Sequence, residues 1–268
     1  MENSYPETLP KAARAFIDNA LQVLPADPRI LALAAAGSYL TGNMDQFSDL
    51  DLIIVTEPEY QEEVLRDRLA IARKLGAYLA GFTGEHVGDS RVLITLYNSP
   101  LLHVDLKFVS LVDAHIRVEE PALLWQRDER ALVALSRGAG PYPQPNIQWI
   151  DDRFWIWMHY GASKIGRGEV FEAIDMINYI RSTVLGPLAL RRVGARPQGV
   201  RRLEIADPDF AMALQKTIPT YSKSDCLRAL RVSATLYQQL REGYPNLMLN
   251  LDVEQAVFAY MEEIEDLI

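Results

Sequence analysis

Apolar positions in the first half of the chain follow two different spacings. Residues 8–24 place Phe16, Ile17 and similar side chains at helical intervals, and the longer amphipathic stretch 58–82 also predicts a helix. Residues 29–36 and 50–55 are short and mostly apolar, which is typical of buried strands. This half of the chain therefore interleaves strands with helices.

Two further apolar runs, residues 91–97 and 101–109, are joined by Asn98-Ser99-Pro100 and predict a β-hairpin. Together with the interleaved elements, they predict an α/β (α+β) domain built on a small mixed sheet.

The second half of the chain has helical spacing only. Residues 138–145, GAGPYPQP, hold two glycines and three prolines, so they can neither continue a helix nor join a ladder easily. We therefore expect a first domain over residues 1–137, a linker over 138–145 and an all-α domain over 146–268. The helices expected in this second domain cover residues 149–165, 169–192, 207–216, 223–242 and 253–268.

Composition and charge narrow the classes of function. The formal net charge is −9 and the only cysteine is Cys226. An acidic surface repels phosphate backbones, so nucleic acid is a disfavoured partner, and a single thiol can form no internal disulfide. No apolar run is long enough for a membrane span and the first residues lack a signal-peptide pattern, so we expect a cytoplasmic protein with no membrane partner.

The segment GSYLTGNMDQFSDLDLIIV, residues 37–55, carries the most informative polar groups. Because strand residues alternate faces, Asp49 and Asp51 project to the same side, roughly 7 Å apart along the strand. Two carboxylates at that spacing can share one or two hard divalent cations. Gly37 lets the backbone approach a ligand closely, and Ser38 offers a hydroxyl and an N–H to phosphate oxygens. Each part alone is common in turns and strand edges, whereas the combination indicates a metal and phosphate site.

A third carboxylate is expected from the later strand LLHVDLKFV, residues 101–109. His103, Asp105 and Lys107 share one face of this strand, opposite an apolar face. A carboxylate among buried strand residues is costly unless it is paired or binds a metal. We therefore predict that Asp105 lies within a few ångströms of Asp49 and Asp51. The alternative is a salt bridge between Asp105 and Lys107.

The order Gly-Ser, Asp-x-Asp and a later strand acid resembles the DNA polymerase β-like nucleotidyltransferase superfamily. The two-domain layout looks like the antibiotic-modifying branch, which includes lincosamide, kanamycin and streptomycin/spectinomycin nucleotidyltransferases. The stretch YGASKIGRGEVFEAIDMINYIR, residues 160–181, is similar to a helical part of that branch and most like the lincosamide enzymes.

The resemblance implies a role for each matching residue. Asp49 and Asp51 would bind two Mg²⁺ ions, and Asp105 would ligate the catalytic ion and take the proton of the attacking hydroxyl. Aminoglycoside enzymes often have Glu at that place, so the shorter Asp105 leaves its action as a base open. Residues expected to contact the nucleoside triphosphate are Gly37, Ser38, Ser48 and Lys164.

In the second domain, Lys164 resembles a helical-domain lysine that contacts phosphates, although a solvated helix end also favours lysine. Tyr160, Glu169 and Glu172 are the candidate contacts to the acceptor, and Glu169 and Glu172 could also simply stabilise the first turn of a helix. We expect the active site in a cleft between the domains.

The function that this resemblance implies is Mg²⁺-dependent transfer of a nucleoside monophosphate, AMP from ATP, to a hydroxyl of a small molecule such as a lincosamide or aminoglycoside antibiotic. One alternative is a protein- or RNA-modifying nucleotidyltransferase of the toxin–antitoxin or regulatory type. Another is a catalytically silent homologue that acts as a binding module. The nucleotide preference and a homodimeric assembly remain open.

Overall fold

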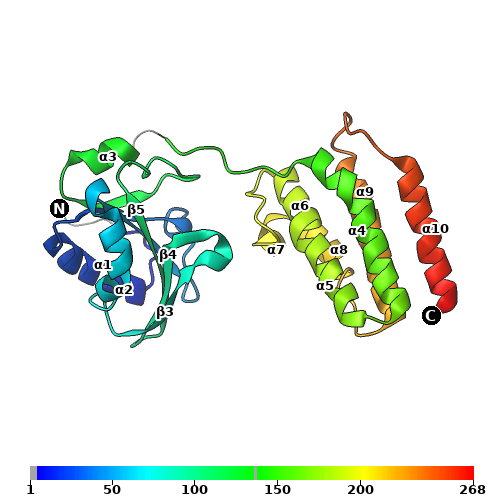
Figure 1. Cartoon of the computed structure of the whole chain (residues 1–268), viewed down its shortest axis with the longest axis horizontal. Helices are drawn as coiled ribbons and strands as arrows, with labels where there is room; N and C mark the ends of the chain where they lie inside the picture. Colours follow the sequence, from blue (N-terminus) through cyan, green and yellow to red (C-terminus); the bar gives the residue numbers. More distant parts are fainter. Residues whose placement is uncertain (1–4, 136–137) are drawn as a thin grey trace. The chain divides into compact units, whose positions relative to one another are not determined.

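The chain divides into two compact units, Met1–Pro141 and Tyr142–Ile268, in a computed structural model that describes residues 5–135 and 138–268 (Figure 1). The boundary falls within the Gly/Pro-rich segment 138–145. Of the first domain expected from the sequence, residues 1–4 and 136–137 lie outside the described part of the chain. Each unit is described separately below.

The first unit is built on a six-stranded mixed sheet with the order β3-β4-β5-β2-β1-β6. Strands β2 and β5 run parallel, and every other neighbouring pair is antiparallel. The sheet and the helical second unit confirm the predicted fold class. The elements of the first unit are α1 (Lys11–Val23), β1 (Ile30–Ala35), β2 (Leu50–Thr56), α2 (Gln61–Ala72), β3 (Tyr78–Gly84), β4 (Asp89–Tyr97), β5 (Leu102–Ser110), β6 (Ala122–Gln126) and α3 (Glu129–Leu135).

Strand alternation gives the central strands β2 and β5 two faces that differ in burial. Leu50, Leu52 and Ile54 of β2 are fully or almost fully buried, in one core with Phe16 of α1 and Val64 of α2. The opposite face carries a second, smaller core, which includes Val55 near the end of β2 and to which α3 contributes. Asp51 and Asp105 belong to this second face and are only partly buried, so their carboxylates can take part in a site there.

The helix predicted over residues 58–82 is wrong in its second half. Helix α2 ends at Ala72, and Tyr78–Gly84 forms strand β3, which pairs with β4. Gly81 lies so close to β4 that an added Cβ would be 2.9 Å from the Ile94 carbonyl oxygen. The tertiary contact with β4 decides the conformation here, because the spacing of a short apolar run does not separate helix from strand.

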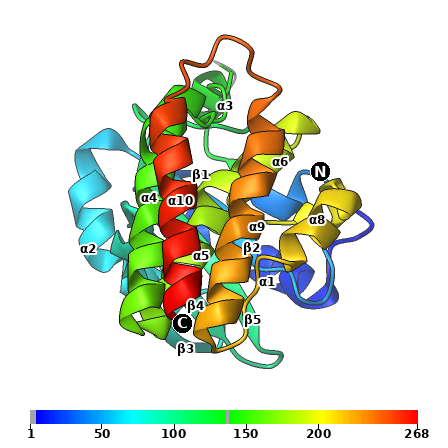
Figure 2. The same ribbon diagram turned by 90° about the vertical axis from the view of Figure 1, so that its right-hand side faces the viewer.

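The second unit is entirely helical, and α4, α9 and α10 run side by side in it (Figure 2). No helix in the described ranges is long and apolar enough to cross a membrane. Asn146, Ser222 and Asn250 each accept a backbone N–H at a helix start, which explains where the three long helices begin. The helices are α4 (Ile147–Arg167), α5 (Val170–Ile180), α6 (Gly186–Arg192), α7 (Leu203–Ala206), α8 (Pro208–Gln215), α9 (Lys223–Arg241) and α10 (Leu251–Leu267).

The helix expected over residues 169–192 is divided into α5 and α6 by a π-helical turn, Arg181–Leu185. Pro187 is the second residue of α6 and has no N–H to donate. Its ring also crowds the carbonyl four residues earlier, so a regular α-helix cannot pass through this point.

Candidate active site

Gly37 brings the end of β1 against the side chain of Asp51. Its φ of +60° lies in the left-handed region, and a Cβ added to it would be only 2.0 Å from Asp51 Oδ2. The backbone N–H of Ala36 also donates to the carbonyl oxygen of Asp51, at 3.0 Å. Only glycine satisfies both the backbone angle and the close approach.

Asp51 and Asp105 are direct neighbours across the parallel strands β2 and β5. The two residues are register partners, so their side chains leave the same face of the sheet about one strand spacing apart. Asp49 comes two residues before Asp51 and lies immediately before β2 rather than within it. The sheet therefore unites acids that lie 54 residues apart in the sequence.

The partner of Asp105 is His103, whose Nε2 lies 2.9 Å from Asp105 Oδ1. Lys107, the alternative partner considered from the sequence, instead forms an ion pair of 3.0 Å with Asp89. Hydrogen bonds from Arg91, and next from Lys107, keep the pKa of Asp89 below its usual range. With Lys107 held by Asp89, His103 is the residue that orients the Asp105 carboxylate.

Glu119 is a further acid at this site that the sequence did not reveal. Its Oε1 accepts the backbone N–H of Gly37 at 2.8 Å, across 82 residues of chain. Glu119 precedes β6 in an irregular segment, where neither periodicity nor a motif marks it. The contact also shows that the Gly37 amide can bind an oxyanion beside Asp51.

The two serines occupy different local structures. Ser38 belongs to the short 3-10 turn Gly37–Tyr39 and so lies directly beside the Gly37–Asp51 contact. The Ser48 hydroxyl accepts the N–H of Asp45 at 2.9 Å and donates to Asp45 Oδ1 at 3.1 Å. Ser48 thus stabilises the turn that leads into Asp49, and its contact with a nucleotide stays a prediction.

Residues 5–135 and 138–268 contain no three His, Cys, Asp or Glu side chains close enough together to hold a metal ion. Like-charged carboxylates repel, so a compact three-acid cage is unfavourable without a cation. Asp51 and Asp105 nevertheless present oxygen donors in register, and Mg²⁺ is commonly held by one or two carboxylates together with substrate phosphates and water. This donor set fits magnesium bound with a triphosphate, and the ligand roles of Asp49, Asp51 and Asp105 stay a prediction.

In the second unit, the four residues singled out from the sequence meet at the corner between α4 and α5. Lys164 Nζ lies 2.5 Å from Glu169 Oε2, and Glu169 raises the pKa of this lysine. The Tyr160 hydroxyl donates to Glu172 Oε2 at 2.9 Å, and the Lys164 amine lies 5.0 Å from the centre of the Tyr160 ring. Their assigned roles toward phosphate and acceptor stay predictions.

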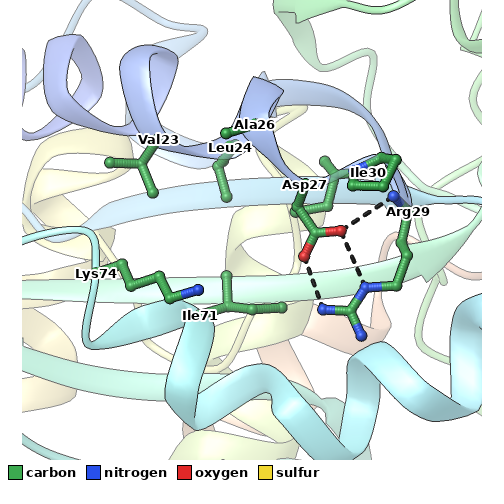
Figure 3. A pocket seen from close by; sticks show the side chains of 9 residues that line it. Val23, Leu24, Ala26, Asp27, Arg29, Ile30, Ile71 and Lys74 are labelled. Atoms are coloured by element: carbon green, nitrogen blue, oxygen red, sulfur yellow. Dashed lines mark hydrogen bonds and ion pairs between the residues drawn. The ribbon is translucent and has the colours of Figure 1, made fainter.

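A pocket of about 660 Å³ lies elsewhere in the first unit (Figure 3). Ile30, the first residue of β1, lines it, whereas Gly37 follows the other end of that strand. Arg29 and Asp27 bind each other at its rim, and Lys74 and Ile71 of the α2 region line the opposite side. The pocket is thus separate from the Gly37–Asp51–Asp105 site, and its largely apolar walls do not suit a triphosphate.

Residues 17–85 match the family model described as a nucleotidyltransferase domain. The chain carries a nucleotidyltransferase domain. The matched range includes Gly37, Ser38, Asp49 and Asp51, so the predicted enzyme class is confirmed. Asp105 lies outside the matched range, but it is the register partner of Asp51, which lies within that range.

Whole-chain comparisons add two solved structures to this nucleotidyltransferase match. An aminoglycoside 6-adenyltransferase from Bacillus subtilis is 16% identical, with a TM-score of 0.43, and the alignment covers 93% of this chain and 97% of that one. A nucleotidyltransferase-like protein from Exiguobacterium sibiricum is also 16% identical, with a TM-score of 0.37 over 84% of this chain and 74% of that one. Among curated proteins none matches the chain. At these TM-scores the likenesses carry no argument about substrate.

Proposed function

We propose that this nucleotidyltransferase uses magnesium to move a nucleoside monophosphate, AMP from ATP, to a hydroxyl of a small molecule. The observation that carries the proposal is the alignment of Asp51 with Asp105 beside the Gly37 amide. This arrangement offers two carboxylates to a divalent cation and a main-chain donor to phosphate within one short region of the sheet.

The Gly37 amide and Ser38 would hold the phosphates of the nucleotide. In support, Gly37 already binds a carboxylate oxygen through its N–H, and phosphate oxygens accept hydrogen bonds of the same kind. The missing Cβ leaves the space in which the backbone approaches the acidic side chains. We therefore assign this turn to the triphosphate rather than to the acceptor.

Asp105 is assigned to the acceptor hydroxyl. A bond forms between the hydroxyl oxygen and the α-phosphorus, the bond from that phosphorus to the leaving phosphate oxygen breaks, and pyrophosphate departs while Asp105 takes the hydroxyl proton. His103 would orient the carboxylate for this transfer through its 2.9 Å contact. Bound magnesium would supply charge stabilisation of the attacking and leaving oxygens.

The acceptor class we propose is a lincosamide or aminoglycoside antibiotic. The net charge of −9 suits a basic acceptor, and the helical stretch 160–181 supports this branch of the family. Tyr160, Glu169 and Glu172 are its proposed contacts, and Lys164 is the proposed second-unit phosphate contact. Tyr160→Phe and Glu172→Gln should then raise the KM for the acceptor while leaving the KM for ATP almost unchanged.

A pyrophosphate-release assay with Mg²⁺, the four nucleoside triphosphates and a set of antibiotics tests the proposal, with product mass identifying the nucleotidyl ester. Asp51→Asn and Asp105→Asn should each lower turnover by about 100-fold or more, because metal-assisted stabilisation supplies much of the rate. Chelation with EDTA should abolish turnover, and added Mg²⁺ should restore it.

Asp113→Asn is the matched control, since it removes one carboxylate from the segment after β5 rather than from the site. It should leave turnover near the wild-type value. Near-normal turnover of Asp51→Asn would contradict the assignment of the site. Nucleotide attached only to a protein or RNA in the same assay would reject the small-molecule acceptor and keep the transfer chemistry.

A further inference from the structure

The contact between Glu119 and Gly37 places a carboxylate where the proposed function needs a phosphate. Glu119 Oε1 lies 2.8 Å from the backbone nitrogen of Gly37. Gly37 is also in close contact with Asp51, because a Cβ added to Gly37 would lie 2.0 Å from Asp51 Oδ2. One N–H group makes one well-aligned hydrogen bond at a time. A phosphate oxygen can therefore reach this donor only when the Glu119 carboxylate leaves it.

The residues before and after Glu119 in the sequence are held by hydrogen bonds. The neighbouring Glu120 accepts hydrogen bonds from Arg117, at 2.6 Å, and from the backbone N–H of Ala139. The N–H of Gly140 donates to the carbonyl oxygen of Arg117 at 2.7 Å, and the Arg117 side chain is only 8% exposed. These hydrogen bonds hold the backbone of the segment, so displacing the Glu119 carboxylate from Gly37 requires a rotation of its side chain rather than a movement of the segment.

The charge of Glu119 opposes a nucleotide in a second way. A triphosphate bound at Gly37 would lie beside the acids of β2 and β5, and Glu119 adds another negative charge to that region. Like charges at such short range repel strongly where water is partly excluded. Removing the Glu119 charge therefore favours the bound triphosphate both at the donor and through space.

We propose that Glu119 competes with the triphosphate: its carboxylate binds the Gly37 amide and must be displaced for the nucleotide to bind there. This inference rests on the proposed function of the Gly37 turn. Glu119 then raises the Kd for the nucleotide. After product release, its carboxylate binds Gly37 again, because the segment that carries it is held in place.

The test measures binding of inorganic tripolyphosphate with Mg²⁺ by calorimetry, in the wild-type chain and in Glu119→Gln. Tripolyphosphate is chosen because it carries no base and so reports on the phosphate contacts alone. The neutral amide is a weaker acceptor than a carboxylate and does not repel phosphate, so the Kd should fall about tenfold in the variant. Asp113→Asn, which removes one charge from the same connecting segment, should leave the Kd within about twofold of the wild-type value.

A second measurement needs no phosphate ligand. In protein labelled with 15N-glycine, the Gly37 amide proton should resonate downfield in the wild-type chain and move upfield in Glu119→Gln, because a charge-assisted hydrogen bond is lost. An unchanged Gly37 resonance would overturn the inference.

The binding outcomes separate this inference from the proposed function. An equal Kd in wild type and Glu119→Gln would overturn the competition and leave the proposed function standing. An equal Kd with strongly reduced turnover would instead make Glu119 a participant in the reaction. Tripolyphosphate binding to neither protein would overturn both proposals.

Discussion

At Gly37 the backbone angle and the space available both require the absence of a side chain. Its φ is +60°, and an added Cβ would lie 2.0 Å from Asp51 Oδ2. Gly37→Ala should therefore displace the Asp51 carboxylate and lower turnover by about 100-fold, the size of effect that a misplacement of about 1 Å can have on a reacting group. Pyrophosphate release and urea unfolding of the variant measure the two consequences.

Gly42 provides the matched control because its φ is +62° and an added Cβ would meet nothing within 4 Å. Gly42→Ala should carry the same backbone cost, about 1–2 kcal/mol of unfolding free energy, without the clash. Its turnover should stay near the wild-type value. If Gly42→Ala loses as much activity as Gly37→Ala, backbone strain rather than the Asp51 contact is the cause.

The residues of the candidate site differ in how well they can be predicted from the sequence. Asp51 and Asp105 follow from strand alternation, because each stands among residues that the same alternation buries. The contact between Glu119 and Gly37 could not be foreseen, since it depends on how an irregular segment folds back across 82 residues. No local spacing encodes such a contact.

Arg29 links the start of β1 to helix α2. Its guanidinium lies 2.7 Å from Asp27, 2.6 Å from Glu63 and 2.7 Å from Asp67, and its side chain is 17% exposed. Arg29→Met would leave three acids facing one another. Because Glu63 and Asp67 are about half exposed, we expect a loss of about 1–3 kcal/mol in the free energy of unfolding at pH 7.

The stabilisation by Arg29 should depend on pH. The hydrogen bond from Arg29 holds the pKa of Asp27 below its usual range, so Asp27 is more acidic in the folded than in the unfolded chain. Its contribution is complete above the unfolded pKa, about 3.9, and is lost as pH falls through the folded value. Urea unfolding at pH 7, 5 and 3.5 should therefore show the difference between wild type and Arg29→Met narrowing only below about pH 4.

Arg130 is the control for this pair of measurements. It also contacts two acids, Glu57 and Asp128, but its side chain is 51% exposed. Arg130→Met should change stability little at any pH, because solvent screens exposed ion pairs. An equal effect of both substitutions would show that the connection to α2 is not what stabilises the fold at Arg29.

At the scale of elements, the sequence predicts the helices and strands that local patterning determines. It does not predict the elements whose conformation depends on contacts with distant parts of the chain. The hairpin of β4 and β5 and the long helices α4 and α9 follow from periodicity and turn residues. The spacing predicts a helix where strand β3 lies, because the strand character of these residues depends on the ladder with β4. The short elements β6 and α3 likewise depend on tertiary contacts: β6 pairs with β1, and α3 packs in the second core of the sheet. Their sequences show no clear period.

At the scale of the whole molecule, the two units have separate cores. The cores of the first unit take their buried members from Leu9 to Leu135, and that of the second takes them from Ile150 to Ile264. In the second core, α4 and α9 are also joined by the hydrogen bond from the buried Tyr237 hydroxyl to Asp151, at 2.7 Å. A unit with its own hydrophobic core should fold without the rest of the chain.

Residues 142–268, produced as a separate chain, should therefore unfold in one cooperative transition. The fragment buries its own apolar face, and its long helices begin at capping residues that it contains, Asn146, Ser222 and Asn250. Far-UV circular dichroism and calorimetry should give a helical fragment whose midpoint lies within a few degrees of one transition of the full chain. A fragment with helical signal but no cooperative transition would show that its packing depends on residues before 142, and the division into two folding units would then be wrong.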